Sequence, residues 1–139
     1  MTEKDKEILI RDLCARLPYR VKVKVKYYDD NWRLLAIYTN DTTYVTRDIG
    51  YPIETYFEDC KPYLFPLSSM TEEQKKYIFN KWGINEEFYF EIDPNWGEYF
   101  VELGDTVDFI DWLNKNHFDY HGLIEKGLAI DATKENNPY

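Results

Sequence analysis

Apolar residues recur at helical spacing in the first part of the chain and stop at Pro18. Thr2 followed by Asp5 matches a capping box, with Asp in place of the usual Glu. The pattern predicts a helix over residues 3–16. Its apolar face contains Ile8, Leu9, Leu13 and Leu17. Its other face should be solvated and contains Lys4, Lys6, Glu7, Arg11 and Asp12.

From Arg20 the period of the pattern changes to two, which is the period of a strand. The segment therefore predicts a strand with one apolar and one cationic face. The apolar set is Val21, Val23, Val25 and Tyr27, and the cationic set is Arg20, Lys22, Lys24 and Lys26. Short polar turns separate it from strands predicted at Trp32–Thr39 and Tyr44–Arg47. Because such turns join antiparallel neighbours, we expect a three-stranded meander.

Two further helices are predicted downstream. Thr71 with Gln74 forms a second capping box, which opens a helix over Glu72–Trp82 that ends at Gly83. The third helix is expected over Val107–Asn116. Its apolar face should contain Val107, Ile110 and Leu113.

The remaining segments carry weaker signals. Three prolines predict that residues 50–67 are irregular with at most short regular pieces, whereas alternation predicts a second hairpin over residues 88–103. A short strand is expected at 128–130, and the polar tail 133–139 should be frayed. Residues 1–132 therefore predict one α+β domain, with an antiparallel sheet of the meander and the second hairpin packed with about three helices.

The composition shows that the chain is acidic and rich in aromatic residues. Aromatic residues make up 18% of the chain, and the formal net charge is −9. The charge is uneven, since residues 1–33 carry nine basic and six acidic side chains while the remainder carries eight and twenty. An acidic chain repels phosphate backbones, so nucleic acid is disfavoured as a partner.

The cysteines and the first residues of the chain give information about the cellular compartment of the protein. Cys14 and Cys60 are far apart and belong to no CxxC pair, so we expect free, reduced thiols. The first residues are charged where a signal peptide is apolar, and no apolar run is long enough to span a membrane. These features predict a cytoplasmic protein without membrane association.

Three stretches carry a resemblance: Met1–Tyr19, Cys60–Gln74 and Trp112–Ala132. They resemble a family of small uncharacterised proteins encoded by gut anaerobic bacteria and by the phages and mobile elements in their genomes. No functional residues of that family can be carried over. The resemblance implies an accessory or regulatory protein of a mobile element, a context in which small proteins that bind other proteins are common.

The two histidines lie together around a carboxylate. On a strand, His117, Asp119 and His121 would share a face, as in the two-His-one-carboxylate set that binds iron or zinc. The alternative is structural: a helix ends near Asn116, His117 interacts with its last carbonyls, and Asp119 caps the turn that follows. We expect no bound metal or other cofactor.

Acidic residues are dense between Glu86 and Asp111 and are interleaved with aromatic rings. Paired carboxylates could serve a hydrolase, so a hydrolase or metal-dependent enzyme using these or the His117–His121 segment is one alternative. A phosphate-mimicking surface that occupies a nucleic-acid site is another. No nucleophile elbow or phosphate-binding glycine loop is present, so a catalytic activity is not indicated.

The partner is predicted to be a protein, bound through aromatic side chains of the second half of the chain. Trp96 lies at a predicted turn tip, and Tyr89 and Tyr99 flank it on the second hairpin. Such rings give large contact area at low entropic cost. The basic row Arg20–Lys26 has phosphate-like spacing, but lysines also protect sheet edges, and other parts of the fold could neutralise it. The sequence leaves the oligomeric state open.

Overall fold

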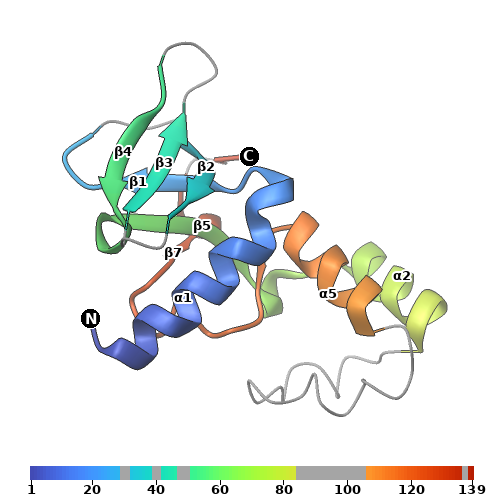
Figure 1. The fold of residues 1–139 in the computed structure, drawn as a ribbon. Helices are drawn as coiled ribbons and strands as arrows, with labels where there is room; N and C mark the ends of the chain where they lie inside the picture. Colours follow the sequence, from blue (N-terminus) through green and yellow to red (C-terminus); the bar gives the residue numbers. More distant parts are fainter. Residues whose placement is uncertain (29–31, 39–41, 47–50, 84–105, 136–137) are drawn as a thin grey trace.

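The computed structural model confirms an α+β fold. It describes residues 1–28, 32–38, 42–46, 51–83, 106–135 and 138–139. In these ranges, three helices pack with a mixed, mostly antiparallel sheet (Figure 1). The helices are α1 (Glu3–Arg16), α2 (Glu72–Trp82) and α5 (Thr106–Lys115). The strands are β1 (Lys22–Val25), β2 (Trp32–Ile37), β3 (Thr42–Thr46), β4 (Ile53–Tyr56), β5 (Cys60–Pro66), β6 (Phe118–Asp119) and β7 (Ile130–Asp131).

Both predicted capping boxes are present. At α1 the Asp5 N–H donates to Thr2 Oγ1 over 3.1 Å, and the Thr2 N–H donates back to the Asp5 carboxylate. At α2 the Gln74 N–H donates to Thr71 Oγ1 over 3.2 Å, with the Gln74 side chain accepting in return. Gly83 has φ 69° and ends α2 in the left-handed region, where glycine carries no Cβ penalty.

The predicted meander is confirmed and extended. The sheet has the order β4-β3-β2-β1-β5-β6, and each step from β4 to β5 is antiparallel. Val21, Val23 and Val25 are buried, while Lys24 and Lys26 are exposed, so the strand faces are as predicted. Lys22 is only half-buried. Because β1 lies between β2 and β5, its lysines do not protect a sheet edge, and that interpretation is wrong.

The prediction that residues 50–67 are irregular is also wrong, because they contain β4 and β5 joined by a 3₁₀ turn at Phe57–Asp59. Pro62 is tolerated inside the sheet by its register. It lies opposite Val23, and the Lys26 N–H donates to the Asp59 carbonyl. Because backbone groups that face the neighbouring strand alternate along an antiparallel strand, the nitrogen of Pro62 faces away from β1, and the proline removes no hydrogen bond of the β1–β5 pair.

The predicted antiparallel sheet is confirmed for most of its strands, and β5 adds parallel pairs to it. β5 pairs in parallel with β6, through Phe65 and Phe118, and with β7, through Tyr63 and Ile130. A parallel neighbour requires the chain to cross back over the sheet, and the connection from β5 to β6 contains α2 and α5. The strand expected at 128–130 occurs at Ile130–Asp131, and the predicted second hairpin lies outside the described residues.

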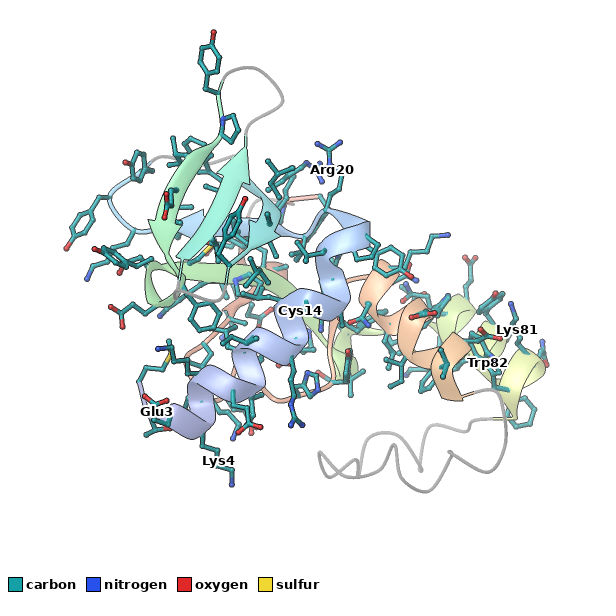
Figure 2. The ribbon with its side chains drawn as sticks, viewed as in Figure 1. Glu3, Lys4, Cys14, Arg20, Lys81 and Trp82 are labelled. Atoms are coloured by element: carbon teal, nitrogen blue, oxygen red, sulfur yellow. The ribbon has the colours of Figure 1, made fainter. Side chains whose placement is uncertain are left out.

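Two apolar clusters stabilise the fold. The larger lies between α1 and the sheet and includes Leu9, Leu13 and the three valines of the β1 segment. The smaller lies where α2 and α5 pack together beyond the end of β5 (Figure 1). In it Trp82 of α2, labelled in Figure 2, contacts Phe109 of α5, and their ring centroids are 5.4 Å apart.

Two local predictions fail in these regions. Val107 is 69% exposed, so the predicted apolar face of α5 is wrong at this residue, whereas Leu113 is buried as predicted and Phe109 is buried beside it. The tail is not frayed at its end: the Tyr139 hydroxyl donates to the Tyr63 carbonyl over 2.8 Å and accepts the Lys22 N–H over 3.0 Å. One aromatic side chain therefore joins the tail to β1 and β5.

Candidate functional site

The structure does not bring His117, Asp119 and His121 together. The Asp119 carboxylate accepts two backbone N–H groups of the following turn, at 2.9 and 3.0 Å. The His121 ring faces α1, whereas the His117 ring stacks on Tyr139 with centroids 3.8 Å apart. Each side chain thus has a different structural partner, and the shared face needed for a metal site is absent from this segment.

The structural interpretation of the segment agrees with this placement. Asp119 caps the turn as predicted, although burial raises the pKa of its carboxyl against the effect of the two N–H groups. His117 has φ 62°, and its backbone N–H donates to the Asn114 carbonyl at the end of α5. Burial, together with the nearby positive charges of Arg16 and Arg33, lowers the pKa of His117 to about 4.

A buried ionic network joins α1 to β6. Arg16 is fully buried and binds the Asp12 carboxylate through Nε and Nη2, at 2.6 and 3.0 Å. Nη2 also donates to the Phe118 carbonyl over 2.6 Å. His121 Nδ1 lies 2.8 Å from the second oxygen of Asp12. The guanidinium also lies over the Tyr120 ring, 5.3 Å from its centroid.

The prediction that Asp12 is solvated is therefore wrong, because it is fully buried. Burial by itself would raise the pKa of Asp12, but the charge of Arg16 and the hydrogen bonds from His121 and Arg16 outweigh it and hold the pKa below its usual value. Burial likewise opposes the charge on Arg16, and Asp12 outweighs it. The pair is charged inside the core, where removal of one partner leaves an uncompensated ion.

The Asp12–His121 contact has the form of the carboxylate–imidazole pair that orients a general base. Since the carboxylate can only accept, His121 Nδ1 carries the proton, and its side chain is 25% exposed. Within the described chain, however, no serine, threonine or cysteine side chain is bonded to this ring. Asp12 is also required by Arg16, which gives the contact a structural role.

Most of the other candidate functional residues lie outside the described ranges. Trp96, Tyr89 and Tyr99 lie in 84–105, as do most of the clustered carboxylates. Among the residues that are described, no group of three His, Cys, Asp or Glu side chains could hold a metal ion. Cys14, on the surface of α1 (Figure 2), and Cys60, in the core, are both free thiols.

The basic row forms part of a wider cationic surface. In the register of the sheet, Lys24 lies directly opposite Lys61 of β5, and Lys22 lies opposite Arg33 of β2. Among the described residues, Lys24, Lys26 and Lys61 form no ion pair. None of these three ammonium groups therefore has an acidic side chain of the described residues within ion-pair distance, although Glu58 and Asp59 lie nearby.

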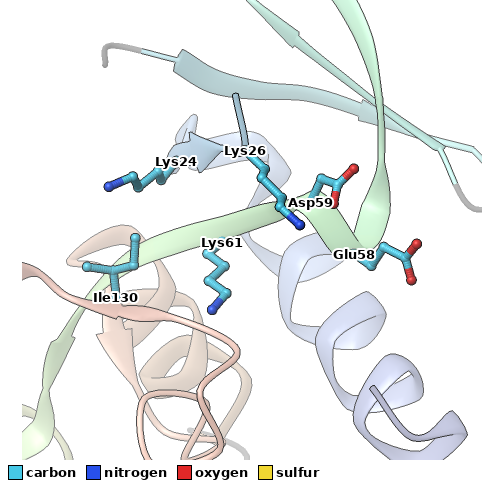
Figure 3. A pocket seen from close by; sticks show the side chains of 6 residues that line it. All are labelled: Lys24, Lys26, Glu58, Asp59, Lys61 and Ile130. Carbon is cyan, nitrogen blue, oxygen red and sulfur yellow. The ribbon is translucent and has the colours of Figure 1, made fainter. Parts of the chain in front are cut away.

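These lysines line a groove of about 460 Å³, which we call the lysine groove. Figure 3 shows Lys24 and Ile130 at one end and Lys26 with the acidic side chains at the other. Lys61 lies between them. Its full lining in the described chain is Lys24, Lys26, Glu58, Asp59, Lys61 and Ile130.

A second groove, of about 490 Å³, adjoins the first, and we call it the tyrosine groove. It lies between the segment after β1 and the end of β4. Tyr27, Tyr28 and Tyr56 line it and are 87%, 50% and 64% exposed. The remaining lining residues are Lys26, Glu54, Thr55 and Asp59. Lys26 and Asp59 belong to both grooves, so the two form one continuous surface.

Half of this surface is predictable from the sequence. The alternation in β1 places Lys24 and Lys26 on an exposed face, but nothing local indicates Lys61, because the prolines predict an irregular segment at Cys60–Pro66. Exposed and buried residues alternate at its start, where Lys61 is exposed between two buried neighbours. Tyr27 was assigned to the apolar face of the strand, but the strand ends at Val25 and the ring is exposed.

None of the helices in the described ranges is long and apolar enough to cross a membrane. No protein-family model, no curated protein and no solved structure matches this chain.

Proposed function

We propose that this chain is a non-catalytic protein-binding protein, and that its partner binds across the lysine groove and the tyrosine groove. The main observation behind this proposal is that the two grooves are continuous, which places exposed tyrosines beside lysines that form no ion pair with the described residues. The resemblance to proteins of phages and mobile elements suggests an accessory or regulatory role. Trp96, Tyr89 and Tyr99 remain proposed contacts of the same kind.

The conformation of Tyr27 supports a role in binding. Its φ of 72° lies in the left-handed region, which a bulky side chain rarely adopts. The ring gains little from the fold in return, because it is almost fully exposed, although Lys26 Nζ lies 5.2 Å from its centroid. Backbone strain of this kind is concentrated at functional sites. We therefore assign the exposed ring to a contact with another molecule.

The composition of the two grooves also suits an interface. Tyrosine supplies a large, rigid contact area with two rotatable bonds, and it is enriched in protein interfaces. Tyr28 is fixed by an edge-on contact with Trp32, with centroids 5.7 Å apart. A ring that is already held in place loses less entropy when a partner binds.

A capture experiment tests the proposal. The immobilised protein is exposed to nuclease-treated extract of its host, and bound proteins are compared for the wild type and a Tyr27→Ala, Tyr56→Ala double variant. The control is a Phe79→Ala, Val107→Ala double variant, which removes exposed apolar side chains from α2 and α5. We expect the tyrosine variant alone to lose its partner while the melting temperature of both stays near wild type.

Equal capture by the tyrosine variant and the wild type would contradict this surface. Loss of the partner only in the control would place the interface on α2 and α5 instead. A separate Trp96→Ala variant tests the contact proposed for the second half of the chain, with partner capture and melting temperature as the two measurements.

A further inference from the structure

The three ammonium groups of the lysine groove have a defined spacing. Lys24 and Lys26 are two residues apart, and the ladder to β5 continues through the Lys26 N–H. Alternate residues of an extended chain are about 7 Å apart along the strand. Lys61 faces Lys24 directly, at a Cβ separation of about 5 Å in such pairs. The groove thus presents a pair of positive charges, on Lys24 and Lys61, and a single positive charge two residues further along β1, on Lys26.

The two facing lysines of the groove repel each other. Like charges directly opposite each other across an antiparallel pair are destabilising. Lys24 and Lys61 occupy such positions, and the described residues provide no counter-charge for either. An anionic occupant would remove this repulsion when it binds. The occupant is therefore expected to carry carboxylates or phosphates.

The lining of the groove distinguishes these two anions. Glu58 and Asp59 border it next to Lys26 (Figure 3). A nucleic-acid strand carries a phosphate at every step, so it would bring charges against both carboxylates, and it would approach a chain of net charge −9. A peptide can carry acidic side chains only where the lysines are and neutral or basic ones beside the carboxylates. The observations favour the peptide.

The tyrosine groove defines the other end of the occupant. It begins at Lys26 and Asp59, where the lysine groove ends, and Tyr27, Tyr28 and Tyr56 surround it. An extended segment that leaves Lys26 enters this groove next. Aromatic walls of this kind favour an apolar or aromatic side chain.

We infer that the occupant is an extended acidic peptide segment of the partner protein, with two acidic residues separated by one position and an apolar residue beyond them. One carboxylate lies between Lys24 and Lys61, the next lies at Lys26, and the apolar side chain enters the tyrosine groove. This inference rests on the proposed function, since it names the ligand of the same surface.

Fluorescence anisotropy with labelled synthetic probes tests it. The first peptide carries two glutamates separated by one residue, followed by a phenylalanine. A second has glutamines in place of the glutamates, a third has the glutamates adjacent, and the last probe is a single-stranded oligonucleotide. Each is titrated with the wild type, with a Lys24→Ala, Lys61→Ala variant and with a Lys4→Ala, Lys76→Ala control of equal net charge.

We expect the alternating glutamate peptide to bind most tightly and to lose at least tenfold in affinity in the Lys24→Ala, Lys61→Ala variant but not in the control. Its affinity for the wild type should also fall when salt is raised from about 0.05 to 0.3 M, because the contacts are exposed ion pairs. The salt titration requires no substitution, so it holds even if a variant is destabilised.

Equal binding of the glutamine peptide would overturn the inference, and so would tighter binding of the oligonucleotide that depends on Lys24 and Lys61. If no peptide binds while partner capture still requires Tyr27 and Tyr56, the acidic segment is refuted but the proposed surface stands. If capture is also independent of the tyrosines, the proposed function fails as well.

Discussion

Replacing Lys61 with glutamate should make the protein more stable. Lys61 and Lys24 lie directly opposite each other on β5 and β1, and both are exposed. The Lys61→Glu substitution changes a pair of like charges into a pair of opposite charges without burying or uncovering apolar surface. A rise in stability would therefore report the repulsion between the two lysines of the native protein.

The size of the effect follows from the geometry of a facing pair. Two lysine side chains can spread until their ammonium groups are about 6–7 Å apart, where the repulsion of unit charges in water is about 0.6 kcal/mol. Replacing it by an attraction of similar size gives a gain of about 1 kcal/mol, within the range measured for cross-strand pairs. For a domain of this size that corresponds to a rise in melting temperature of about 3–5 °C.

Thermal and urea unfolding of the wild type and the variant measure this gain. Lys61→Gln should give about half of it, because it removes the repulsion without adding an attraction. The gain from Lys61→Glu should shrink in about 0.5 M salt, which screens exposed charges. Lys126→Glu changes the net charge equally at an exposed turn and serves as the control.

The reasoning is refuted if Lys61→Glu leaves the melting temperature unchanged, or if the control raises it by the same amount. If the gain in melting temperature from Lys61→Glu persisted in high salt, the stabilisation would not come from the interaction of charges. The same substitution should weaken binding of the acidic peptide. Opposite changes in stability and binding are typical of a residue retained for an interaction at the expense of the fold.

Three further predictions concern the buried groups. Asp12→Asn should lower the free energy of unfolding by about 3–5 kcal/mol in urea titrations, because it leaves the fully buried Arg16 without its counter-ion; a loss below about 1 kcal/mol would contradict the charged pair. Tyr139→Phe should lower the same quantity by about 1–3 kcal/mol, because it removes the two hydrogen bonds that its hydroxyl forms with the Lys22 N–H and the Tyr63 carbonyl; an unchanged value would show that the tail is not docked. The pKa of His117 falls from 6.5 in the unfolded chain to about 4 in the fold, so the unfolded state binds the extra proton, and stability should decrease as the pH is lowered through this interval. His117→Asn, which suits the positive φ, should flatten that part of the pH dependence, and an unaltered slope would rule out this histidine as its source.

Local patterns were sufficient for the elements that depend on local interactions. The capping boxes of α1 and α2 and the alternation in β1 involve residues a few positions apart, and the structure confirms them. β5 was missed because Pro62 and Pro66 count against a strand when its neighbours are unknown. Only the register shows that the nitrogen of Pro62 faces away from β1.

The candidate site was less predictable for the same reason. The pairing of Lys24 with Lys61 joins strands that are far apart in the chain, so no local period reveals it. Asp12 and Arg16 are four residues apart on α1, a spacing that is common for solvent-exposed ion pairs. Their burial depends on Phe118 and His121, from the last part of the sequence. Three-dimensional proximity, rather than residue type, distinguishes this pair from a surface pair.

The position of Arg16 also sets an order on folding. The meander from β1 to β4 has short connections, so it can form early in synthesis. Arg16, however, receives its carbonyl from Phe118, which leaves the ribosome about a hundred residues later. Until then, burial of Arg16 would leave its guanidinium without the hydrogen bond to the Phe118 carbonyl. β5 also lacks both of its parallel neighbours until then. Docking of α1 and completion of the sheet therefore both depend on residues that are synthesised last.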